Sequence, residues 1–290
     1  MIAPLGRRLV EVTAYRRVGA YDILACADPD GPAPDPGQFY MLAAAERWGG
    51  GEDERPFLPR ACSVMRHRPA SVPASRPATA GGGEAAPEGP RPATAGGGEA
   101  AAGGRLEFML EDVGPGTHRL GELRPGDALW LAGPFGIGFT RPRDGRRPLL
   151  VGGGVGTAPF AIWQDALGDA LALLGFRDLE HAHGASLLRG ARVATDDGSA
   201  GHQGPVTDLL LAELGRDPHA EVYACGPHGM LEAVRAICAE QNVPAQLALE
   251  SGMACGYGAC FGCVVPTKTG YVRLCVDGPV LQADTLERVG

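Results

Sequence analysis

Residues 148–167 read PLLVGGGVGTAPFAIWQDAL. A short apolar run is followed by a glycine turn and then by apolar residues at helical spacing, which predicts a strand, a tight turn and a helix. Such a turn, here with Gly152, Gly153, Gly154 and Gly156, lets phosphate groups approach the N–H groups at the start of the helix. The pattern is G-x-G-x-A-P, and no acidic residue follows at the usual ribose-binding position. The motif alone is therefore also consistent with an ordinary strand–helix turn that binds no ligand.

The residues after this turn continue the alternation of strands and helices. Buried strands are predicted at 171–176, 191–195 and 221–225, and helices at 206–214 and 228–241. Strands that alternate with helices indicate a parallel sheet covered by helices. The region therefore predicts an α/β domain.

The residues before the turn have a different pattern. Short runs of alternating or apolar residues, separated by turn residues, occur at 8–15, 20–27, 35–44, 60–67, 105–112 and 127–134. Six short strands without helices between them favour a small antiparallel barrel.

An exact repeat interrupts this series of strands. Residues 76–86 and 91–101 both read RPATAGGGEAA. This composition of Pro, Ala and Gly cannot form a core. We therefore expect a mobile, functionally inert insertion at about 68–104.

Four cysteines lie near the end of the chain with the spacing C-x4-C-x2-C-x11-C, at Cys255, Cys260, Cys263 and Cys275. The first three match the spacing that holds a plant-type [2Fe–2S] cluster. Gly256, Gly258 and Gly262 lie between them, and glycine tolerates the positive φ angles that a tightly curled loop needs.

Other uses of these cysteines remain open. A structural zinc site usually has two C-x2-C pairs, whereas only Cys260 and Cys263 form one here. Disulfide bonds would suit a secreted protein, but Met1 begins no recognisable signal peptide. Unligated thiols would need no particular spacing. The other four cysteines are scattered and typical of small buried apolar residues: Cys26, Cys62, Cys225 and Cys238.

The composition limits the classes of partner. The chain has 290 residues with 44% hydrophobic residues and a net charge of −8. It has no basic run, so we expect no nucleic-acid partner. No apolar run reaches the ~18 residues of a membrane span. We expect a cytoplasmic protein of two or three domains.

Several motifs together resemble the ferredoxin reductase superfamily. They are RACS at 60–63, GPGT at 114–117, GPFGIGF at 133–139, GGGVGTAP at 152–159, LLGFRD at 173–178, TDDGSAGHQG at 195–204 and ACGPHGML at 224–231. Together with LESGMACGYGACFGC at 249–263 and CVDGPVL at 275–281, the whole chain outside 68–104 is similar to the electron-transfer subunits of dihydroorotate dehydrogenase B.

The resemblance implies a flavin site in the barrel. Arg60 would pair with the FAD pyrophosphate, Ser63 would lie near flavin N5, and the backbone of Gly116 and the hydroxyl of Thr117 would donate to phosphate. Cys62 stands where many members of the superfamily have a tyrosine that stacks on the flavin. The remaining residues implied along the flavin are Ala61, Met109, Leu110 and Glu111.

The resemblance also implies a dinucleotide site in the α/β domain. Gly154, Gly156 and Thr157 would meet the phosphates, and Cys225, Gly226 and Pro227 would line the nicotinamide pocket. Asp196 and Asp197 end a strand where the adenosine ribose could lie. Carboxylates there would repel a 2′-phosphate, so NAD is favoured over NADP, although a solvated turn explains TDDGS as well.

The implied fold is an α+β multidomain protein. It has a Greek-key barrel for FAD at 1–143, an α/β parallel-sheet domain for NAD at 144–246 and a [2Fe–2S] module at 247–290. No general base for dihydroorotate oxidation is evident. The resemblance implies that an FMN-containing catalytic subunit supplies electrons through the cluster and FAD to NAD⁺ in pyrimidine biosynthesis, in a heterotetramer with two copies of each subunit.

Two alternatives use the same modules. One is a subunit of another NAD(P)H-linked ferredoxin or sulfide reductase, or of a hydrogenase. The other is a redox-sensing iron–sulfur flavoprotein that regulates an interaction without turnover. Rapid reduction of a bound flavin by NADH would argue against the second.

Overall fold

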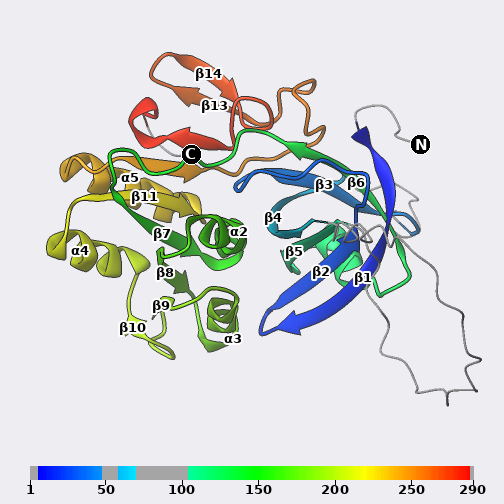
Figure 1. Ribbon diagram of the computed structural model, residues 1–290, viewed down its shortest axis with the longest axis horizontal. Helices are drawn as coiled ribbons and strands as arrows, with labels where there is room; N and C mark the ends of the chain where they lie inside the picture. The colour runs from blue at the N-terminus through cyan, green and yellow to red at the C-terminus, as the bar shows by residue number, and fades with distance from the viewer. Residues whose placement is uncertain (1–5, 48–57, 70–103, 288–290) are drawn as a thin grey trace, which may run out of the picture.

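The computed structural model describes residues 6–47, 58–69 and 104–287. Figure 1 shows a barrel built from the N-terminal strands beside a sheet with helices on both faces, and a small hairpin from the C-terminal part. The expected insertion at 68–104 falls almost entirely on residues 70–103, which lie outside the described residues.

Six strands close the barrel in the order β1-β2-β5-β4-β3-β6, and all neighbouring pairs are antiparallel. They are β1 (Arg8–Val18), β2 (Tyr21–Ala27), β3 (Phe39–Ala44), β4 (Arg60–Arg68), β5 (Arg105–Glu111) and β6 (Ala128–Phe135). Each lies at a predicted strand. The alternation of apolar residues places Val12, Leu24, Phe108 and Leu129 inside the barrel, where all four are buried.

The expectation that no helix lies among these strands is wrong. Residues Pro115–Gly121 form α1 between β5 and β6. Pro115 stands at the start of this helix, a position that tolerates proline because the first N–H groups of a helix have no partner within it. The segment has seven residues, too short for its period to stand out in the sequence.

The larger sheet has seven strands in the order β10-β9-β8-β7-β11-β12-β15. They are β7 (Arg147–Gly153), β8 (Leu171–Phe176), β9 (Arg192–Thr195), β10 (His202–Gln203), β11 (Ala220–Cys225), β12 (Ala245–Ala248) and β15 (Val280–Gln282). Every pair is parallel except β12 with β15. The predicted fold class is thereby confirmed.

Helices cover both faces because successive strand residues point to opposite sides. Leu149 and Val151 pack with α4 (Val206–Arg216) and α5 (His228–Glu240), whereas Leu150 packs with α2 (Ala158–Leu167) on the other face. The shorter helices on that second face are η3 (Gly154–Thr157), α3 (Leu179–Ala182) and η4 (His183–Leu187).

The C-terminal part contributes a hairpin, a sheet strand and a short helix. These are β13 (Val264–Thr267) with β14 (Gly270–Arg273), then β15, then η5 (Ala283–Thr285). The boundary that we place at 246/247 lies within β12, and β15 joins the larger sheet. We keep the three-part division as a proposal about function.

Membrane insertion by a helix finds no support in the part of the chain that the structure describes, where no helix is both long and apolar enough to span a bilayer.

Candidate functional site

A cavity of about 280 Å³ lies where β4 and β5 meet the turn before α2. Because β4 and β5 are neighbours in the barrel, residues that are far apart in the sequence share its wall. The predicted flavin residues that line it are Arg60, Ala61, Cys62, Ser63, Met109, Leu110, Glu111 and Thr117. The other walls come from η3, from the start of α2 and from residues just after β12.

Gly116 packs directly against the Arg60 guanidinium. A Cβ atom at Gly116 would lie 2.5 Å from Arg60 Nε, so a larger residue there would displace the guanidinium from this position. Arg60 Nη1 donates to the Leu58 carbonyl at 2.7 Å. The guanidinium is thus held against the backbone of the predicted phosphate loop, with donors remaining for an anion, and this arrangement fits a pyrophosphate.

The hydroxyl of Thr117 closes its own turn. It accepts from the N–H groups of Val113 and Gly114 at 3.0 and 3.1 Å, and it donates to the Gly114 carbonyl at 3.0 Å. We therefore expect backbone N–H groups, rather than this hydroxyl, to donate to a phosphate here.

Glu250 is a cavity residue that the sequence reasoning missed. It lines the cavity together with residues of β4, and its side chain is exposed. Burial among protein atoms raises the pKa of its carboxyl group, and the nearby His228 opposes that shift. Burial, with a contribution from Glu250, raises the pKa of the Cys62 thiol to about 12, so Cys62 is a neutral wall residue.

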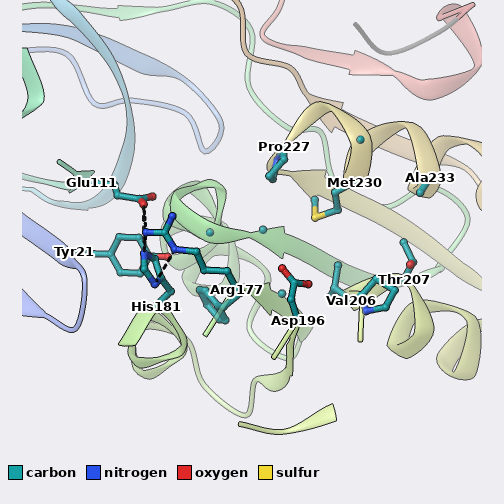
Figure 2. Close-up of a pocket in the computed structure, with 16 residues that line it drawn as sticks. Tyr21, Glu111, Arg177, His181, Asp196, Val206, Thr207, Pro227, Met230 and Ala233 are labelled. Atoms are coloured by element: carbon teal, nitrogen blue, oxygen red, sulfur yellow. Dashed lines mark hydrogen bonds and ion pairs between the residues drawn. The ribbon is translucent and has the colours of Figure 1, made fainter. Parts of the chain in front are cut away.

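A second cavity, of about 460 Å³, lies at the carboxyl ends of the sheet strands, facing the barrel (Figure 2). Ligands of open α/β sheets bind at this edge. Three predicted dinucleotide residues line it: Gly154, Asp196 and Pro227. Glu111 lines both cavities, so the flavin and dinucleotide cavities adjoin.

Besides Asp197, four predicted dinucleotide residues lie outside the lining of this cavity. A Cβ atom at Gly156 would lie 2.6 Å from the Cys225 carbonyl oxygen, and one at Gly226 would lie 2.9 Å from the Gly153 nitrogen. Cys225 is 1% exposed. Thr157 is fully buried and donates to Met109 Sδ at 3.6 Å. These residues pack within and around the glycine turn rather than on the cavity surface. The contact of Thr157 with Met109 connects the turn to β5.

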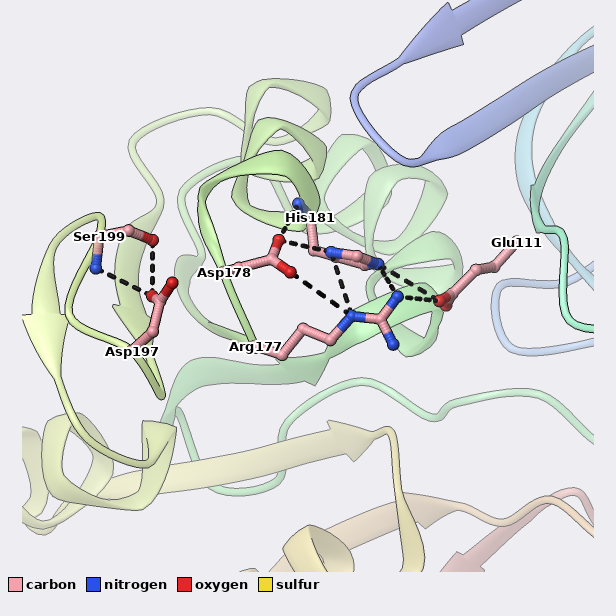
Figure 3. A network of polar contacts seen from close by, with 6 residues as sticks. All are labelled: Glu111, Arg177, Asp178, His181, Asp197 and Ser199. Carbon is pink, nitrogen blue, oxygen red and sulfur yellow. Dashed lines mark hydrogen bonds and ion pairs between the residues drawn. The ribbon is translucent and has the colours of Figure 1, made fainter.

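A polar network at the barrel-facing side of the cavity was also missed (Figure 3). Arg177 Nη2 lies 3.3 Å from Glu111 Oε1. His181 Nε2 lies 3.4 Å from the same oxygen, and His181 Nδ1 lies 2.6 Å from Asp178 Oδ1. The network connects β5 of the barrel to the end of β8 and α3. Glu111 was assigned to the flavin, and Arg177 and Asp178 belong to the LLGFRD motif, but the sequence does not show that they meet, because LLGFRD alone does not show which barrel strand it faces.

The two aspartates after β9 differ. Asp196 lines the cavity and its N–H donates to the Phe176 carbonyl at 3.0 Å. Asp197 instead accepts from the Ser199 N–H and hydroxyl at 2.9 and 2.6 Å. Hydrogen bonds from Ser199 lower the pKa of Asp197. Of the two aspartates, only Asp196 lines the cavity.

The four C-terminal cysteines lie as two pairs. Cys263 Sγ is 3.3 Å from Cys275 Sγ, and both residues are buried. Cys260 is hydrogen-bonded to Cys255, and these two are more exposed. Among the described residues, no three His, Cys, Asp or Glu side chains surround a point that one metal ion could occupy. Two pairs fit a two-iron cluster, in which each iron takes two protein ligands, better than one zinc ion.

The loop backbone also suits thiolate ligands. Burial opposes ionisation of Cys255, but N–H groups of Cys260, Tyr257 and Ala259 point to its sulfur and lower its pKa to about 6. Gly256 and Gly258 have φ angles of 80° and 87°, as expected. The third left-handed residue is Phe261, with φ of 58°, and not Gly262. The Gly262 N–H donates to Cys260 Sγ at 3.4 Å.

Known proteins resemble the chain in sequence. Residues 250–287 match the family model described as the iron–sulfur cluster binding domain of dihydroorotate dehydrogenase B. The electron transfer subunit of dihydroorotate dehydrogenase B (NAD(+)) from Clostridium acetobutylicum is 34% identical over 186 residues, covering 63% of this chain and 74% of that protein. The subunit of the same name from Caldanaerobacter subterraneus subsp. tengcongensis is 39% identical over 190 residues, covering 62% and 74%.

Solved structures share the fold. The NADH-dependent reduced ferredoxin–NADP oxidoreductase superposes with a TM-score of 0.72 and 22% identity, over 97% of this chain and 90% of that one. The ferredoxin reductase of carbazole 1,9a-dioxygenase has a TM-score of 0.58 and 21% identity, over 84% and 68%.

Proposed function

The chain belongs to the family of electron-transfer subunits of dihydroorotate dehydrogenase B, and we propose from this that it carries electrons from a catalytic partner subunit to NAD⁺. The observation that carries the proposal is the continuity of the three sites. The flavin and dinucleotide cavities share Glu111, and Glu250, Ser251 and Met253 line the flavin cavity immediately before Cys255.

FAD, a [2Fe–2S] cluster and NAD are the cofactors of this function. FAD, when bound, exchanges two electrons with nicotinamide and single electrons with an iron–sulfur cluster. In this chain β4 and β5 would orient the flavin, with Arg60 at its pyrophosphate. Cys255, Cys260, Cys263 and Cys275 would ligate the cluster. The division of labour follows the proposed parts 1–143, 144–246 and 247–290.

The partner supplies the oxidation chemistry. The family name denotes one subunit of a larger enzyme, which implies a catalytic subunit. We propose that this partner contains FMN, that it oxidises dihydroorotate for pyrimidine biosynthesis, and that two copies of each subunit form a heterotetramer. We place the assembly in the cytoplasm, where thiols stay reduced, since no cysteine in the described part of the chain forms a disulfide bond.

Replacing Asp196 by serine should relax the preference for NAD. A 2′-phosphate next to this carboxylate is repelled, and at an exposed site we expect the substitution to shift the NADH-to-NADPH ratio of kcat/KM roughly tenfold toward NADPH, or ~1.4 kcal/mol. Reduction of a one-electron acceptor by each nucleotide measures the ratio. Asp197→Ser is the matched control, because its carboxylate is engaged by Ser199, and it should leave the ratio unchanged. Equal shifts of the kcat/KM ratio in both variants would mean that Asp196 does not lie next to the 2′ position of the nucleotide.

The direct test of the proposed function is purification of the tagged chain from its native host. We expect a flavin-containing partner to co-purify, and the complex to form NADH when given dihydroorotate and NAD⁺. The isolated chain should show NADH-dependent flavin reduction but no dihydroorotate oxidation. A complex that reduces NAD⁺ only from another donor would contradict the proposal.

A further inference from the structure

Tyr21 carries a buried hydroxyl group with no hydrogen-bond partner among the described residues. The side chain is 0% exposed, at the start of β2 in the barrel. Its ring contacts the His181 ring edge-on, with centroids 5.7 Å apart, and closely approaches Gly184. Buried hydroxyl groups nearly always find a partner, because burial without one is unfavourable.

The position of this hydroxyl points to a ligand. Tyr21 belongs to the lining of the dinucleotide cavity, where Figure 2 shows it beside Arg177 and Glu111. A Cβ atom at Gly154 would lie 3.9 Å from the Tyr21 hydroxyl oxygen, and apart from Gly154, its chain neighbours and the backbone of its own helical turn, no other described atom lies within 4 Å of that point. Gly154 belongs to the glycine turn, where phosphate groups are expected to approach backbone N–H groups.

The surroundings keep the phenol protonated. Burial, followed by the charge of Glu111, raises the pKa of Tyr21, while Arg177 acts in the opposite direction. The hydroxyl is therefore protonated at neutral pH and can donate a hydrogen bond. A donor beside a glycine turn is suited to an anionic oxygen.

We propose that the Tyr21 hydroxyl donates a hydrogen bond to the pyrophosphate of the bound dinucleotide. The flavin barrel thereby supplies a ligand to the dinucleotide site of the α/β part. The Arg177 side chain, which is 64% exposed, would move from Glu111 to the same pyrophosphate and open the way to the hydroxyl. The inference rests on the proposed dinucleotide site and adds to it a residue from a different part of the fold.

Tyr21→Phe tests the proposal through two measurements. Isothermal titration of the oxidised, FAD-loaded protein with NAD⁺ and with ADP-ribose should show roughly tenfold weaker binding of both, because both contain the pyrophosphate. The Tm of the variant without nucleotide should equal or exceed that of the parent, because the substitution removes an unsatisfied polar group.

Tyr223→Phe is the matched control. Tyr223 is also fully buried, but its hydroxyl donates to the Thr140 carbonyl at 2.9 Å. This variant should have a lower Tm and unchanged affinity for NAD⁺ and ADP-ribose.

The outcomes separate the inference from the proposed function. If the parent protein does not bind NAD⁺, the proposed dinucleotide site is wrong. If the parent binds it and Tyr21→Phe binds both nucleotides equally well, the role of Tyr21 is wrong. A Tm lowered as in Tyr223→Phe would show that the hydroxyl has a structural partner, and weaker binding of NAD⁺ alone would exclude the pyrophosphate; either result overturns the proposal.

Discussion

Cys260→Ala is expected to leave the purified protein without its iron–sulfur cluster while FAD remains bound. Cys260 forms one of two cysteine pairs, and removing it leaves one iron with a single protein ligand. Cys260 is not among the residues that line the flavin cavity, so the substitution leaves the lining of that cavity unchanged. The EPR signal of the reduced protein should disappear. Electron transfer between FAD and the partner subunit, which passes through the cluster, should fall to background.

The control for this substitution is Cys238→Ala. Cys238 is 1% exposed, lies on α5 in the core of the sheet and does not belong to the C-x4-C-x2-C-x11-C motif. Its loss should cost on the order of 1 kcal/mol of stability and leave the EPR signal intact. A reduced-cluster signal that persists in Cys260→Ala would exclude Cys260 as a ligand, and a zinc content near one per chain in the parent would exclude the cluster.

The strands of the barrel were predictable because each one carries its own local pattern. Val10 and Val12 alternate with polar residues in β1, and glycine and proline mark the turns that separate the strands. The glycine turn at 152–156 was predictable for the same local reason. The elements that were not predicted are short, and two of them show why: α1 is too short to show a period, and β15 has three residues that become a strand only by pairing with β12.

The residues of the candidate site also fall into two groups, those that the sequence could assign and those that it could not. Arg60, Ser63 and Met109 could be assigned from motifs, and they share one cavity because their strands are neighbours. Tyr21 and Glu250 could not, because each resembles an ordinary residue of its segment. Tyr21 opens an apolar strand and looks like a core residue, and Glu250 simply follows a strand. Their significance appears only when the fold brings β2 to the glycine turn and places the residues after β12 opposite β4.

The cysteine loop lies directly against the flavin barrel, as the proposed function requires. The cysteine loop begins two residues after Met253, the last residue of that segment in the flavin wall. Gly256 packs so closely on Met41 of β3 that a Cβ atom there would lie 2.6 Å from Met41 Cγ. The loop is therefore held against the barrel by direct contact as well as by the chain, which favours electron transfer between the two proposed cofactors.

Arg60→Ala should weaken FAD binding by roughly ten- to hundredfold, which corresponds to ~1.5–3 kcal/mol for the loss of a charge-assisted hydrogen bond to phosphate. The guanidinium packs on Gly116 at the predicted phosphate loop, and Leu58 uses only one of its nitrogens. Titration of the apoprotein with FAD measures the effect. Iron content should not change, because none of the four proposed ligands contacts Arg60 in the described structure.

Two further variants distinguish a pyrophosphate contact from a general effect of charge. Arg60→Lys keeps the positive charge but not the planar fork, so we expect an affinity between those of the parent and Arg60→Ala. Arg124→Ala removes an arginine between α1 and β6, whose guanidinium lies 4.0 Å from the centre of the Tyr15 ring, and it should leave FAD affinity unchanged. If Arg124→Ala weakens FAD binding as much as Arg60→Ala, the effect comes from barrel charge or stability. If Arg60→Ala binds FAD as tightly as the parent, the pyrophosphate lies elsewhere in the cavity.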